Sequence, residues 1–147
     1  MPTETELVWA AGFFDGEGHI GAHLCNGRNG YAHWKLSLMV VNTHTPSVEI
    51  FQRLFGGTIK HRTNGRRVDG SNCKEISVWR APEQQIGEIL RRLVPHLVTK
   101  KQQALLAIEF RQTYRGYVRG AGVFLPDEVK QERADFASRI RLLNNCA

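Results

Sequence analysis

The chain has 147 residues, of which 41% are hydrophobic and 23% are charged, a length and composition that fit one globular domain with its own core. No apolar run reaches the about 20 residues that a membrane-spanning helix needs, and the acidic start of the chain lacks the basic segment of a signal peptide. Three widely spaced cysteines form no CxxC motif, which favours reduced thiols. We therefore expect one intracellular domain over residues 1–147 that does not enter a membrane.

The positive charge is concentrated in one part of the chain. The net charge is +6 and the isoelectric point is near 9.6. Residues 18–81 contain nine Lys and Arg against three Asp and Glu, and also five of the six histidines, whereas the remainder of the chain is neutral. A localised basic surface favours a polyanionic partner, of which nucleic acid is the commonest. A basic protein without such a partner is the alternative.

Helical periodicity with capping signals predicts five helices. Segments in which apolar and polar residues alternate, separated by turn residues, predict two hairpins. In chain order these elements are a helix at 4–14, strands at 18–25 and 32–41, a helix from 46 to the glycines at 56 and 57, strands at 58–67 and 73–81, and helices at 82–95, 99–115 and 126–145. Hairpins between helices predict an α+β fold with antiparallel pairing.

Both predicted hairpins carry basic and hydrogen-bonding side chains on one side and apolar side chains on the other. A two-stranded ribbon of this kind fits the major groove of DNA, where such side chains contact base edges and phosphates. A solvated outer face is the alternative, although two hairpins with the same bias favour binding. The predicted DNA contacts are His19, His23, Arg28, His33, Lys35, Ser37, Lys60, Arg62, Asn64, Arg66, Arg67, Lys74 and Ser77.

The first helix ends in two carboxylates, Asp15 and Glu17, each followed by glycine. Acidic groups at a helix C-terminus are unfavourable unless a cation is near, and carboxylate and carbonyl oxygens are the ligands of Mg²⁺. Such an ion beside a nucleic-acid surface suggests phosphodiester chemistry. A surface turn is the alternative. The preceding Ala10-Ala11-Gly12 would let a second copy of the helix approach closely.

The segment "WAAGFFDGEG" (Trp9 to Gly18) resembles the LAGLIDADG motif of homing endonucleases. The predicted αββαββα order matches the fold of the family, and "LSL" at 36–38 and "LVPHLVTKKQQA" at 93–104 are similar to further segments of single-motif members. The resemblance covers about residues 5–115, so the core is expected there and a helical segment at about 126–145. It implies a homodimer that places its hairpins as a saddle on double-stranded DNA. The implied interface residues are Val8, Ala11, Gly12 and Asp15.

The resemblance also implies roles for single residues. Glu17, the last acid of the motif, would be the metal ligand, with the backbone carbonyl of Gly16 beside it. Lys100 corresponds to the active-site lysine of the family, and His44 to a polar residue that orders water, with Asn42 as the alternative. Asp15 would support the site structurally. The implied cofactor is Mg²⁺, with Mn²⁺ able to substitute.

The implied reaction is Mg²⁺-dependent hydrolysis of both strands at a long pseudo-palindromic DNA site, by a protein encoded in an intron. Two alternatives are an RNA maturase that binds intron RNA and a DNA-binding regulator that does not cleave. Organellar, bacterial and phage origins fit equally. At one position the chain departs from single-motif relatives, because Val48 stands where they have an arginine; Arg53 could replace it only if the geometry allows.

Overall fold

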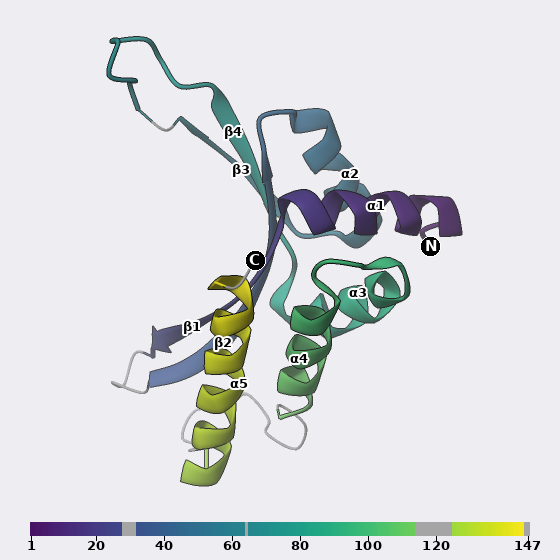
Figure 1. The fold of residues 1–147 in the computed structure, drawn as a ribbon, viewed down its shortest axis with the longest axis vertical. Helices are drawn as coiled ribbons and strands as arrows, with labels where there is room; N and C mark the ends of the chain where they lie inside the picture. Colours follow the sequence, from purple (N-terminus) through teal and green to yellow (C-terminus); the bar gives the residue numbers. More distant parts are fainter. Residues whose placement is uncertain (28–31, 64, 114–124, 146–147) are drawn as a thin grey trace.

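The computed structural model describes residues 1–27, 32–63, 65–113 and 125–145 (Figure 1). Its order of elements is the predicted αββαββα arrangement followed by two further helices, which confirms the α+β fold. The elements are α1 (Glu4–Glu17), β1 (Gly18–Asn26), β2 (Ala32–Asn42), α2 (Thr45–Phe55), β3 (Thr58–Thr63), β4 (Glu75–Arg80), α3 (Ile86–Leu93), α4 (Lys101–Gln112) and α5 (Asp127–Asn145). Short 3₁₀ turns at Glu83–Gln85 and Val94–His96 flank α3.

The four strands form one antiparallel sheet in the order β1-β2-β4-β3. The two hairpins reach away from a central region where α1 ends, and α1 to α4 lie together on one side (Figure 1). Side chains alternate between the two faces of a strand. The strand residues of the main buried cluster belong to one face, which is therefore the face that the helices cover: Ile20, Ala22, Leu36, Leu38, Val40 and Trp79. Val78 is also buried but lies on the other face, where it pairs with Val41 and Lys60.

Helix α1 is fixed at both ends by its own sequence. The hydroxyl of Thr3 accepts a hydrogen bond from the amide of Glu6, whose carboxylate accepts one from the amide of Thr3, so the pair forms a capping box. At the other end, a Cβ on Gly18 would lie 2.2 Å from the ring of Phe14, which is fully buried. Glycine is therefore required where the helix passes into β1.

Helix α5 packs against the first hairpin on the covered face of the sheet. The side-chain amide of Asn144 donates a 2.8 Å hydrogen bond to the carbonyl of Ile20. The guanidinium of Arg141 lies 4.8 Å from the ring centre of Trp34, a distance suited to a cation–π contact. Ala137 and Ile140 are fully buried. The C-terminal helix thus contributes to the same core as the elements before it.

Several predicted elements differ in extent from the observed ones. Helix α1 continues to Glu17, three residues beyond its predicted end at residue 14. The strands of the second hairpin are shorter than predicted because the chain turns between them at Gly65 and Gly70, which have φ angles of 77° and 82°. The helix predicted from Pro82 begins as a 3₁₀ turn and becomes α-helical only at Ile86. None of the described helices has both the length and the hydropathy to cross a membrane.

Candidate functional site

The C-terminal end of α1 presents the acidic group expected to hold a metal. Glu17 is exposed, and within the described ranges its carboxylate forms no hydrogen bond or ion pair. Gly16 is also exposed, with no atom within 4 Å of the position where a Cβ would lie. The last turn of the helix contains no basic residue of its own. An exposed carboxylate therefore lies at the carbonyl end of a helix, and oxygens of these two kinds suit a hard cation.

Lys100 reaches this helix end from the start of α4. Its ammonium donates a hydrogen bond to the backbone carbonyl of Asp15. The carboxylate of Asp15 accepts from the amides of Val98 and Lys100, at 2.7 and 2.9 Å. Three hydrogen bonds thus join two segments that are more than 80 residues apart. Asp15 lies where a supporting residue was expected, and its carboxylate is engaged within the chain.

His19, predicted as a DNA contact, lies close to this junction. It is the second residue of β1 and follows Glu17 by two positions. Burial lowers the pKa of His19, and the positive charge of nearby Lys100 lowers it further, so both favour the neutral form of the ring. The end of α1 therefore has a carboxylate, an ammonium and an imidazole in one neighbourhood.

His44 caps the start of α2 and is exposed. Its Nδ1 lies 2.8 Å from the hydroxyl of Ser47, and its backbone amide donates to the side-chain oxygen of Asn42 at 2.8 Å. Asn42 is half-buried and bonded to the backbone, so it is placed to orient His44. Gly18 pairs with Val40 across the hairpin, so Glu17 and His44 both lie at this end of the β1–β2 pair.

Neither Val48 nor Arg53 supplies this site with the arginine that the family resemblance led us to expect. Val48 is fully buried in the core. Arg53 forms a 2.8 Å ion pair with Glu6 in the first turn of α1. Eleven residues separate Glu6 from Glu17, about 16 Å along the helix at about 1.5 Å per residue. Arg53 is therefore held near the opposite end of α1 and does not serve the site.

Most of the predicted DNA contacts share the face of the sheet opposite the core. Direct cross-strand pairs set this face: His19 with Met39, Gly21 with Ser37, His23 with Lys35 and Cys25 with His33. The register continues through β4 to Lys60 and Arg62 on β3. We call this the open face, and its polar members are His19, His23, His33, Lys35, Ser37, Thr58, Lys60, Arg62 and Arg80.

Ser77 is a correction to the predicted contacts. It is only 1% exposed, pairs with His61 and Asn42, and therefore lies on the core side of the sheet. Its hydroxyl lies 2.7 Å from that of Thr45 and 3.0 Å from Nδ1 of His61. The serine connects the second hairpin to the start of α2 and is not available to DNA.

The remaining predicted contacts lie in the connections between strands. Arg66, Arg67 and Lys74 are exposed in the segment between β3 and β4, whereas Arg28 and Asn64 lie outside the described residues. Sequence reasoning missed Arg80, which is exposed on the open face and pairs with Met39 and Thr58 in the middle of the sheet. Its position in the β4 alternation could have revealed it.

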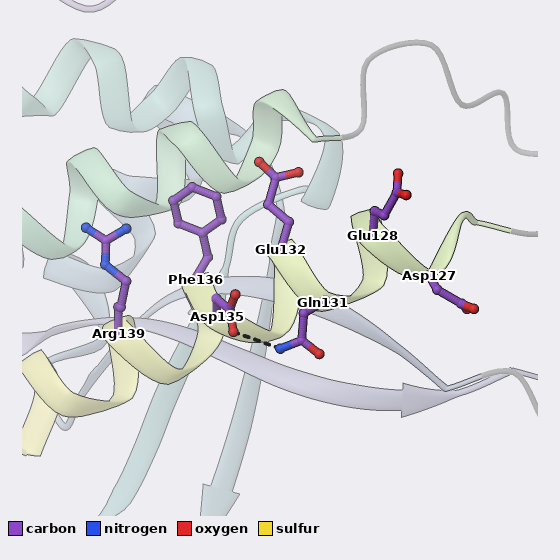
Figure 2. A pocket seen from close by; sticks show the side chains of 7 residues that line it. All are labelled: Asp127, Glu128, Gln131, Glu132, Asp135, Phe136 and Arg139. Carbon is purple, nitrogen blue, oxygen red and sulfur yellow. Dashed lines mark hydrogen bonds between the residues drawn. The ribbon is translucent and has the colours of Figure 1, made fainter.

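One acidic side chain adjoins the open face. The carboxylate of Glu83 lies 3.5 Å from the ammonium of Lys35, and both side chains are largely covered. A different acidic surface lies on α5, where Asp127, Glu128 and Asp135 line a hollow (Figure 2). This hollow contains none of the predicted site residues, and its charge has the sign of DNA. It therefore does not extend the basic surface.

The exposed side of α1 contains part of the predicted dimer interface. Val8 is 51% exposed, and Gly12 has no atom within 4 Å of the place of a Cβ. Ala11 is a correction, because it is 0% exposed and packs in the core of its own chain. The open stripe of α1 therefore consists of Val8, Gly12 and Gly16, spaced four residues apart along the helix.

The donor set of one chain is incomplete as a metal site. Among the described residues no three His, Cys, Asp or Glu side chains come together in a group that could hold a metal ion. Glu17 with the carbonyl end of α1 supplies hard oxygen ligands but only one carboxylate. The residues thus fit Mg²⁺ in type, because this ion is commonly bound by one or two carboxylates together with waters and substrate phosphates.

Comparison with known proteins identifies the fold. No family model matches the sequence, and no curated protein of similar sequence was found. The homing endonuclease I-CvuI, solved with its target in the presence of Ca, is 25% identical, with a TM-score of 0.69 over 95% of this chain and 82% of that chain. The archaeal intron-encoded homing endonuclease I-Vdi141I, complexed with DNA, is 13% identical, with a TM-score of 0.72 over 95% of this chain and 84% of that chain.

A third comparison bears on size. The meganuclease I-SmaMI, bound to DNA, is 14% identical with a TM-score of 0.63, and the match covers 90% of this chain but only 43% of that chain. These neighbours confirm the resemblance that the motif indicated.

Proposed function

We propose that this chain, which has the fold of the LAGLIDADG homing endonucleases, is a site-specific DNA endonuclease that works as a homodimer. The observation that carries the proposal is the convergence at the end of α1. There Glu17 is exposed beside the last carbonyl groups of the helix, and Lys100 is tied to the same helix end. The open face begins two residues later, at His19. A hydrolytic site and a basic surface would therefore act on one polyanion.

The open face supplies the chemistry for binding double-stranded DNA. Lys60, Arg62 and Arg80 are exposed on it, and the arginine and lysine side chains between β3 and β4 extend the positive charge. Such groups bind phosphates and read guanine edges, whereas histidine and serine donate to or accept from bases. The neighbours I-CvuI and I-Vdi141I were solved in complex with DNA. Their common fold supports the same use of the sheet here.

Three observations support a homodimer. One chain offers a single exposed carboxylate at the site, and two chains would place two Glu17 side chains around a common centre. One chain also corresponds to only 43% of I-SmaMI. The stripe of Val8, Gly12 and Gly16 is open on α1 and lacks bulky side chains at two of its three positions. Small residues of this kind allow two helix backbones to approach closely.

Glu17 and the carbonyl of Gly16 would hold Mg²⁺, with Mn²⁺ able to substitute, because both ions favour oxygen ligands. When bound, the ion activates water and stabilises negative charge on the phosphate. In hydrolysis the water oxygen bonds to phosphorus, one P–O ester bond breaks, and the leaving oxygen takes up a proton. Lys100 adds positive charge beside the phosphate, where the contact with the carbonyl of Asp15 holds its ammonium in place. His44, fixed by Ser47 and Asn42, orders water.

Cleavage is tested after the preferred site has been selected from a random double-stranded DNA library by binding. Wild-type protein with Mg²⁺ should cut both strands of the selected DNA. Glu17→Gln should bind it within about threefold of wild type but cut at least about 100-fold more slowly. Glu109→Gln, an exposed change on α4, is the matched control and should cut normally. Wild-type protein that binds but never cuts, with Mg²⁺ or Mn²⁺, contradicts the proposal; tight binding of structured RNA would then support the maturase alternative.

Dimerisation is tested with Gly12→Phe. The chain itself leaves space at this position, so the variant should fold with unchanged circular dichroism. It should nevertheless sediment as a monomer, because the ring would separate the two α1 helices. Gln131→Phe, which adds the same ring to the exposed side of α5 (Figure 2), should stay dimeric. A wild-type monomer at micromolar concentration, with and without DNA, would overturn the homodimer.

A further inference from the structure

The ring of His19 occupies an unusual position on the open face. A Cβ on Gly21 would lie 2.8 Å from Nε2 of His19 and 2.9 Å from the hydroxyl oxygen of Ser37. His19 and Gly21 are two residues apart on the same face, so the imidazole lies along the strand, over the glycine, and does not stand away from the sheet. Any side chain at position 21 would displace it. The absence of a side chain there makes the cradle in which the ring rests.

Two polar atoms converge above this glycine. Nε2 of His19 and the hydroxyl of Ser37 are both less than 3 Å from the same point, the place of the missing Cβ. In the described parts of the chain no hydrogen bond or ion pair joins the imidazole to another residue. A phosphate oxygen that approaches the sheet here would meet a ring nitrogen and a hydroxyl group together.

The location of this pair differs from that of the other polar residues on the open face. His19 is the first open-face residue after Glu17, and Lys100 is near enough for its charge to act on the ring. His23 lies on the same strand and the same face but four residues farther on, about 13 Å at about 3.3 Å per residue. The first histidine therefore lies beside the end of α1 and Lys100, whereas the second lies farther out along the first hairpin.

We propose that His19 is a catalytic residue that binds the scissile phosphate through Nε2 and does not read a base. This inference rests on the proposed function and revises the role that the sequence pattern suggested for His19. A contact to the reacting phosphate strengthens as charge develops on it, so its loss slows the chemical step more than it weakens binding. A base contact has the opposite signature.

The test compares His19→Ala with the matched control His23→Ala on the DNA selected with wild-type protein. Affinity is measured with Ca²⁺ in place of Mg²⁺, and cleavage is measured in a single turnover at saturating protein with Mg²⁺. His19→Ala should lower the cleavage rate by about 100-fold and change the affinity by less than about threefold. His23→Ala should show the opposite pattern, with a larger effect on affinity or on the preferred sequence than on the rate at saturation. Glu109→Gln, which is exposed on α4 and outside the proposed DNA surface, should change neither quantity.

Gly21→Ala gives a second measurement, because it removes no polar group but displaces the ring of His19 and the hydroxyl of Ser37. It should slow cleavage in the wild-type background and have little further effect in the His19→Ala background. If wild-type protein cuts and His19→Ala cuts at the same saturated rate, the catalytic role is wrong and the proposed function stands. If wild-type protein binds its selected DNA but does not cut it, both are overturned.

Discussion

The junction between α1 and α4 should depend on the charge of Asp15. Its carboxylate accepts two backbone hydrogen bonds, at 2.7 Å from Val98 and 2.9 Å from Lys100. In Asp15→Asn the remaining oxygen can accept one of them, while the amide group faces the other N–H as a second donor. A hydrogen bond to a charged group contributes about 1.5–3 kcal/mol. Because the junction is only half-buried, we expect a loss of about 2 kcal/mol in the free energy of unfolding.

For a chain of this length, about 2 kcal/mol corresponds to a fall of roughly 6 °C in the midpoint of thermal unfolding. The measurement is calorimetry or circular dichroism at one protein concentration, since the midpoint of a dimer depends on concentration. Asp135→Asn is the matched control, because Asp135 is exposed on α5 and contacts only Gln131 among the described residues. If Asp15→Asn melts within 1 °C of this control, the carboxylate does not hold the start of α4 as the geometry indicates.

Three further predictions concern other parts of the chain. Gly57→Ala should lower the free energy of unfolding by at least about 2 kcal/mol, because φ is 90° and a Cβ would lie 2.2 Å from a backbone oxygen. Gly65→Ala, where φ is 77° but the space is open, should lower it by about 1 kcal/mol, and equal unfolding midpoints in urea for the two variants would contradict this. Hydrogen bonds from the Thr3 amide and then from Arg53 lower the pKa of Glu6 from 4.5 to about 2, so the stability they add is present above pH 4.5 and lost as the pH falls toward 2; Glu6→Gln should remove this dependence from acid titrations. Arg80→Ala should weaken DNA binding and reduce the slope of log affinity against log salt by about 1, whereas an unchanged slope would place Arg80 away from phosphate.

Local patterns were sufficient to predict the elements and their order. Helical periodicity, proline at helix starts and glycine at helix ends predicted all five helices, because each signal acts within a few residues. Alternation and turn residues predicted the two hairpins, and the motif predicted the acidic end of α1. The predicted bounds were wrong where the local sequence pattern was weak, since β3 and β4 are both shorter than predicted.

The arrangement of side chains across elements depended on the tertiary structure. Ser77 was assigned to the basic side of its hairpin, but the pairing of β4 with β2 sets its register and turns this serine toward the core. Ala11 was predicted to contact a partner helix, but it is buried by residues of its own chain. One residue of register decides which face a strand residue occupies, and the sequence of a single strand does not contain its partner.

For the candidate site too, the sequence determined one part of the chemistry and the tertiary structure another. The sequence alone determined that the chain has acids and glycines at the end of its first helix and a concentration of basic residues in its two hairpins. Only the tertiary structure placed Lys100 on the carbonyl of Asp15, tied Arg53 to Glu6 and laid the ring of His19 over Gly21. The physical reason is range: composition and periodicity act between neighbours in the chain, whereas these contacts, apart from that of His19, join residues 47 and 85 positions apart. Even the local contact of His19 depends on Ser37 from the next strand and on the charge of Lys100 from a distant helix.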